Sequence, residues 1–152
     1  MRMCKEFSPL LIAAKGTIVQ LGSIAGIMPY VFGSAYNASK AALHAYSNTL
    51  RVELAPFGVK VVIIVTGGVL SQIARVDRVL APDSLYLPIE ADYIRRTKHS
   101  QEVGIPADKY AKQVVSKLTT RNPPREIWAG YGARLVWFVS MFFPKSILVR
   151  SY

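Results

Sequence analysis

The sequence has little cysteine and no apolar run long enough to cross a membrane. Its single cysteine, Cys4, excludes an internal disulfide and any zinc cluster built from cysteines. We therefore expect an intracellular, reducing compartment and a packed, unreactive thiol at Cys4. The apolar segment of residues 135–143 has nine positions, whereas a spanning helix takes about 20 residues.

Acidic residues are also scarce. Nine acidic residues stand against 19 basic ones, which gives a net charge of +10. The two halves of the chain carry about the same excess and no basic tail is present, so we predict no nucleic-acid partner. The balance is compatible with acidic ligands, a phosphorylated cofactor or an anionic lipid surface.

Two kinds of binding motif are missing. None of the ten glycines forms GxGxxG or GxxxGxG, the turn that seats a dinucleotide pyrophosphate at the start of a helix. Because there is no HxxxH, CxxC or carboxylate cluster, we predict no metal site.

The patterns that are present predict an α/β domain. A short apolar run, an alanine-rich helical stretch and a second apolar run form a βαβ unit, which favours a parallel sheet covered on both faces. A glycine turn at residues 66–68 follows the second strand, and no clean periodicity extends over residues 69–106, as is typical of a lid or binding loop. We expect helices at residues 1–14, 34–54 and 107–119 and strands at 17–21, 59–65 and 126–129.

Three residues in the βαβ unit carry candidate chemistry. Ser23 comes directly after the first strand, where open α/β sheets place their ligands. Tyr36 and Lys40 are four residues apart, so a helix stacks the ammonium beside the phenol, and a nearby cation favours a phenolate. The alternative is a buried alanine-rich helix with an incidental tyrosine and lysine, which does not explain the spacing to Ser23.

Ser23, Tyr36 and Lys40, together with the Ala-Ser-Lys-Ala-Ala-Leu sequence around Lys40, resemble the catalytic signature of the short-chain dehydrogenases/reductases. The resemblance implies the carboxyl-terminal half of a doubly wound, Rossmann-like domain, with the amino-terminal cofactor-binding half absent from these residues. It divides the chain into a catalytic half (1–70), a substrate lid (69–106), and a helix, short strand and apolar tail (107–152).

The resemblance also implies roles for individual residues. Tyr36 would donate a proton to a ketone oxygen, and Ser23 would hydrogen-bond that oxygen. Lys40 would hold the nicotinamide ribose of NADP(H), and Tyr36 would also contact this end of the cofactor. Backbone of Thr66, Gly67, Gly68 and Val69 would face the nicotinamide. Without the other half, we expect weak cofactor binding or none, and no activity.

Within the family, the chain is most similar to the fungal NADPH-dependent 1-acyldihydroxyacetone phosphate reductases. Three features support this similarity: the Thr66-Gly67-Gly68 turn, the Ile-Trp-Ala-Gly strand and the aromatic tail. Most members of the family have Pro-Gly at the position of the turn. This likeness implies a small lipid-like ketone or alcohol as substrate, lying under the lid, and a peripheral position on the endoplasmic reticulum or lipid droplets.

Two other functions stay open. The chain is then either a non-catalytic partner of an intact relative, forming a homo- or hetero-oligomer through the Ser34–Leu54 helix, or a peripheral membrane protein acting through residues 135–143.

One turn after Lys40, His44 is predicted to be packed or hydrogen-bonded. The cations Arg95, Arg96 and Lys98 either contact a phosphate or are simply exposed.

Overall fold

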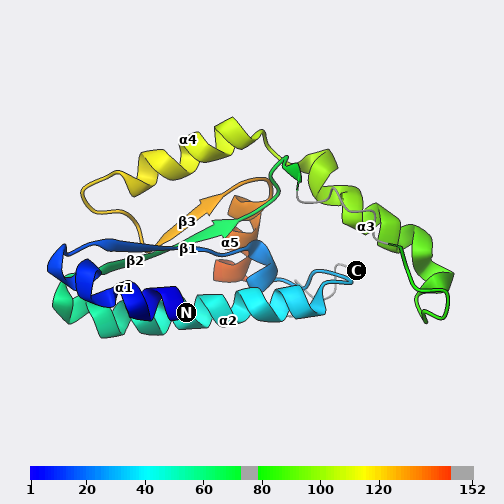
Figure 1. Cartoon of the computed structure of the whole chain (residues 1–152). Helices are drawn as coiled ribbons and strands as arrows, with labels where there is room; N and C mark the ends of the chain where they lie inside the picture. Colours follow the sequence, from blue (N-terminus) through cyan, green and yellow to red (C-terminus); the bar gives the residue numbers. More distant parts are fainter. Residues whose placement is uncertain (73–78, 145–152) are drawn as a thin grey trace.

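A three-stranded parallel sheet lies at the centre of this computed structural model, which describes residues 1–72 and 79–144 (Figure 1). β1 (Thr17–Leu21) pairs with β2 (Lys60–Thr66), and β2 pairs with β3 (Glu126–Ala129), so the strand order is β1-β2-β3. Because both pairings are parallel, the carboxyl ends of all three strands meet at the same edge.

Helices cover both faces of the sheet, as the continuous apolar sequence of β2 predicts. α1 (Arg2–Ala13) and α2 (Ser34–Leu54) lie on one face, and α4 (Ala107–Leu118) lies on the other (Figure 1). The predicted α/β class is therefore confirmed, with the second strand displaced by one residue from the expected 59–65.

Successive residues of β2 point to opposite faces and so join two cores. The first core lies on the α2 face and consists of Ile18, Leu50, Leu54, Val59 and Val61. Four partly buried residues pack against it: Cys4, Leu11, Ile12 and Tyr46. On the α4 face, the second core is bordered by Tyr110 and Leu118 and consists of Val62, Ile64, Val114, Ile127 and Ala129.

The described part of residues 69–106 contains regular structure that the absence of clean periodicity did not reveal. α3 (Glu90–Val103) is a helix of 14 residues, preceded by the short 3₁₀ helix η4 (Leu87–Ile89). The sequence of this helix has no apolar stripe from which periodicity could reveal it, and none of its described side chains is buried. Residues 73–78 of the predicted lid lie outside the described residues.

The apolar tail forms α5 (Ala133–Phe142), which begins at Gly132 in a left-handed conformation (φ 72°). Only Ala133 and Val136 of this helix are buried. In the described part of the chain, every helix is too short or too polar to cross a bilayer.

Candidate active site

Ser23 lies where the sequence predicts it, directly beyond the carboxyl end of β1. Its backbone is extended (φ −157°, ψ 151°) and its Oγ accepts a hydrogen bond from the Ala25 amide at 3.1 Å, which caps the 3₁₀ helix η1 (Ile24–Gly26). The side chain is 8% exposed. Because the Oγ acts as an acceptor here, its own proton remains available to a substrate oxygen.

Tyr36 and Lys40 share a face of α2, one turn apart, as predicted. The Lys40 Nζ lies 5.7 Å from the centre of the Tyr36 ring and donates to the Leu21 carbonyl oxygen at 2.8 Å. Tyr36 is 46% exposed, and its hydroxyl makes no hydrogen bond to the described residues. Lys40 therefore connects the phenol to the strand end that carries Ser23.

His44 makes a second connection between α2 and that strand end, one turn beyond Lys40. The Ser23 amide donates to the His44 Nε2 at 3.3 Å, which confirms the predicted hydrogen-bonded histidine. Gly22 leaves room for the ring, since a Cβ there would lie 2.6 Å from Nε2. The i+4 spacing from Lys40 hinted at this role, but the sequence does not reveal that the imidazole holds the backbone of Ser23.

The environment keeps this imidazole in its accepting, neutral form. Burial lowers the pKa of His44 from its ordinary value of 6.5, and the nearby Lys40 ammonium lowers it further, while Glu126 opposes both. A neutral ring can accept the Ser23 N–H, whereas an imidazolium cannot. The backbone of Ser23 is thus held by a histidine whose surroundings disfavour protonation.

The turn after β2 is tied to other loops of the molecule. A Cβ on Gly67 would lie 2.0 Å from the Tyr131 carbonyl oxygen, and the Gly68 amide donates to that oxygen at 2.9 Å. Thr66 Oγ1 lies 2.8 Å from the Tyr110 hydroxyl, and Val69 bridges Ile105. These contacts explain both glycines by packing, and the predicted contact of residues 66–69 with a nicotinamide stays a prediction.

Two cavities open beside the elements that carry the site. One of about 250 Å³ lies between η1 and α2, with Gly26, Asn37 and Ala41 in its wall. The other, of about 460 Å³, lies among α4, β3 and α5, with Lys109 and Arg134 in its wall. Tyr36 and Lys40 line neither of these two cavities. Within the described residues no cluster of His, Cys, Asp and Glu could hold a metal.

A nicotinamide ribose fits the groups present at Lys40. An ammonium has three N–H donors, and the Leu21 carbonyl accepts one, so two are left for ribose hydroxyls. The exposed phenol of Tyr36 lies on the same helix face. No residue in the sequence offers the glycine-rich turn for a pyrophosphate.

The parallel sheet and the residues at its strand ends define half of a Rossmann-like α/β domain. The chain belongs to the short-chain dehydrogenase family, because the family model described as short chain dehydrogenase matches residues 1–79. In fold, it is similar to a short-chain dehydrogenase from Streptomyces avermitilis, with a TM-score of 0.71 and 26% identity over 92% of this chain and 51% of that one.

Fungal proteins are among the similar sequences. The chain is 43% identical to a short-chain dehydrogenase of Pyricularia oryzae over 97% of this chain and 53% of that protein. It is 42% identical to the NADPH-dependent 1-acyldihydroxyacetone phosphate reductase of Saccharomyces cerevisiae over 98% of this chain and 51% of that protein. The chain thus spans about half the length of the curated relatives it matches.

Proposed function

We propose that these residues supply the proton-transfer half of an NADPH-dependent ketone reductase. The observation that carries the proposal is the connection of Lys40 to both the Tyr36 ring and the Leu21 carbonyl, two residues before Ser23. This arrangement supports a proton donor and a cation working beside the strand end that carries the Ser23 hydroxyl, where parallel sheets bind their ligands.

Each of the three side chains has a distinct task. Tyr36 donates its proton to the carbonyl oxygen as that oxygen gains negative charge, and the Lys40 ammonium stabilises the phenolate that remains. The Ser23 hydroxyl hydrogen-bonds the same oxygen and orients the ketone. A bound NADPH would supply the hydride, and Lys40 would hold its ribose through the two remaining N–H groups.

We further propose a lipid-like ketone such as 1-acyldihydroxyacetone phosphate as the substrate. The names of the relatives in Saccharomyces cerevisiae and Schizosaccharomyces pombe support this choice. The net charge of +10 favours a phosphorylated substrate over a neutral one.

The test is activity of a completed protein, made by joining the first half of the Saccharomyces cerevisiae relative to residues 1–152. We expect NADPH oxidation in the presence of 1-acyldihydroxyacetone phosphate and less with an unphosphorylated acyl ketone. A completed protein that folds and binds NADPH, yet reduces neither ketone, would contradict the proposed reaction.

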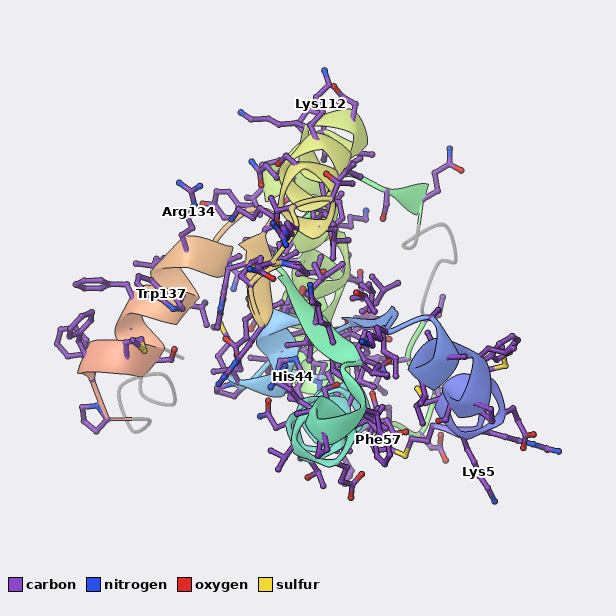
Figure 2. The ribbon with its side chains drawn as sticks, turned by 90° about the vertical axis from the view of Figure 1, so that its left-hand side faces the viewer. Lys5, His44, Phe57, Lys112, Arg134 and Trp137 are labelled. Carbon is purple, nitrogen blue, oxygen red and sulfur yellow. The ribbon has the colours of Figure 1, made fainter. Side chains whose placement is uncertain are left out.

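A peripheral membrane contact through α5 is a second candidate function. Arg134 lies at the start of the helix. Six large apolar residues of this region are 41–67% exposed: Leu135, Trp137, Phe138, Met141, Phe142 and Phe143. Figure 2 shows Arg134 and Trp137 on a helix that stands off one side of the molecule. Exposed aromatics beside a cation suit the interface of an anionic bilayer, and such a contact would place the protein on an intracellular membrane.

A non-catalytic role through α2 is the remaining alternative. The helix exposes a stripe of small residues, Ala38, Ala41, Ala42 and Ala45, which allows a second helix to approach closely. A pull-down with the Saccharomyces cerevisiae relative distinguishes this role: retention of that protein by residues 1–152, lost when Ala42 is replaced by Glu, supports it.

A further inference from the structure

Residues 84–103, termed here the α3 arm, extend away from the sheet (Figure 1). At its carboxyl end, the arm joins the body through backbone hydrogen bonds from Leu70 to Ile105 (2.9 Å) and from Ile105 to Gly68 (3.3 Å). No described side chain of α3 is buried. The helix therefore has no core of its own to hold its position, and its contacts near the amino end decide where it lies.

Aromatic rings make those contacts. The ring of Phe32 meets the ring of Tyr86 edge to face at a centroid distance of 5.6 Å, and it meets Tyr93 in the same manner at 5.5 Å. In the same helix and the same loop, the Arg96 guanidinium stacks on the Tyr30 ring. Edge-to-face pairs in this distance range are attractive beyond the area that they bury.

The backbone of Phe32 is in an unusual conformation. Its φ is +59°, in the left-handed region that a bulky residue rarely adopts, whereas the adjacent Gly33 has a φ of −124°. The chain thus places a large ring at a position where glycine would be relaxed. Such strain persists when surrounding contacts stabilise it, and here those contacts are the two tyrosine rings of the arm.

The loop that carries Phe32 is fixed to the catalytic helix. Asn37 lies in the first turn of α2, and its side-chain amide hydrogen-bonds the backbone of Tyr30. The backbone amide of Asn37 donates to the Gly33 carbonyl oxygen at 2.8 Å. Tyr36 precedes Asn37 in that turn. A ring held by this loop therefore fixes the arm relative to the candidate proton donor.

We propose that Phe32 is a positioning and specificity-determining residue: it holds the α3 arm beside the first turn of α2 and so limits the space available to a substrate at Tyr36. The part concerning substrate rests on the proposed function. The part concerning the arm is independent of it, since Phe32 contacts Tyr86 and Tyr93 in the chain itself.

Hydrogen exchange of residues 1–152 tests the position of the arm. Phe32→Ala and Phe32→Gly both remove the ring, and the glycine also relaxes the backbone, so exchange at residues 84–99 should rise at least tenfold in both while β2 stays protected. Phe32→Tyr keeps a ring and should restore wild-type exchange, and Val31→Ala, at an exposed neighbour, should change nothing. Tyr86→Ala, at a position 54% exposed, should reproduce the effect of Phe32→Ala without unfolding the chain. Unchanged exchange in the ring-deleted variants would overturn the proposal.

Kinetics of the completed protein test the specificity. In Phe32→Ala we expect the KM for the acyl ketone to rise about tenfold with little change in kcat, and bulkier ketones to become better substrates relative to wild type. Equal kcat and KM in Phe32→Ala and wild type would overturn this part. A completed wild-type protein without turnover would instead overturn the proposed function, and the exchange experiment would still decide the role of Phe32.

Discussion

Ser23 at the end of β1 and two side chains of α2 carry the proposed chemistry, and Tyr36 on α2 is the decisive one. Tyr36→Phe removes the proton donor and keeps the ring, so in the completed protein ketone reduction should fall about 10²- to 10⁴-fold. Since Tyr36 is 46% exposed and its hydroxyl bonds no described residue, thermal stability should hardly change. Steady-state NADPH oxidation gives the rate, and turnover near wild type would refute the assignment of Tyr36.

Lys40 should affect two parameters where Tyr36 affects one. Lys40→Met removes the ammonium beside the phenol and the donor to the Leu21 carbonyl, so both kcat and NADPH affinity should decrease in the completed protein. Lys60→Met is the matched control, because Lys60 lies at the opposite end of the sheet and donates to the Arg121 carbonyl. A Lys40→Met variant with unaltered NADPH affinity would contradict the ribose contact.

His44 makes stability depend on pH in a defined direction. Because folding lowers the pKa of His44 below 6.5, the unfolded chain takes up a proton first as the pH falls. The stabilising contribution is complete above pH 6.5 and is lost as the pH decreases toward the lowered value. Chemical denaturation at pH 7.5 and pH 5.5 gives the free energy of unfolding at each pH. Between these two pH values it should decrease less for His44→Gln than for wild type.

The control for His44 is Ala45→Gln, at an exposed position in the same turn of α2. It should retain the wild-type pH dependence, since it leaves the bond from the Ser23 amide in place. A His44→Gln variant whose free energy of unfolding falls as steeply as that of wild type would show that another group accounts for the effect.

The glycines in the turn after β2 allow the packing role of this turn to be tested apart from any role in ligand binding. Gly67→Ala places a Cβ 2.0 Å from the Tyr131 carbonyl oxygen, so we expect it to destabilise the fold by about 1–3 kcal/mol or more, without any cofactor. Gly68→Ala meets its nearest atom at 3.3 Å and should cost less. Urea denaturation compares the two, and equal stability would mean that the turn is not packed as described.

α5 is the element that tests the membrane contact. Replacing Trp137 and Phe142 with Ser should release residues 1–152 from anionic liposomes in a flotation assay, because two aromatic anchors are lost. The control pair is Val52 and Phe57, which are also exposed and lie elsewhere in the fold (Figure 2 labels Phe57). Flotation of the Trp137 and Phe142 variant equal to that of wild type, or unfolding of that variant, would contradict a membrane contact through α5.

The sequence predicts those elements whose apolar residues recur at a regular spacing, including α1, none of whose residues is buried. β1, β2 and α2 were predictable because apolar runs end at glycine, and because Ser23, Tyr36 and Lys40 follow at fixed spacing. α3 was not predictable, since its sequence has no regular apolar spacing and its ring contact is with Phe32, far away in the sequence. The packing of Gly67 on Tyr131 was hidden for the same reason: the two residues are far apart in the sequence and meet only in the fold.

Among the described strands, β1 lies at the edge of the sheet, and two of its apolar side chains contact solvent. Val19 is 40% exposed and Leu21 is 63% exposed, and β2 occupies only one edge of β1. Unpaired strand edges associate readily, so isolated residues 1–152 should form oligomers or aggregates. Sedimentation of the isolated and completed proteins at equal concentration compares them, and a stable monomer of residues 1–152 would contradict this expectation.

We propose that these residues contain the proton-transfer groups of a reductase and lack its dinucleotide site. Calorimetric titration with NADPH tests it most directly, on residues 1–152 and on the completed protein. The pyrophosphate and adenosine make most of the contacts of a dinucleotide, and the sequence offers no turn for them. We therefore predict weak or undetectable binding to residues 1–152 and saturable binding, one NADPH per chain, to the completed protein. Tight, stoichiometric binding by residues 1–152 alone would contradict the account.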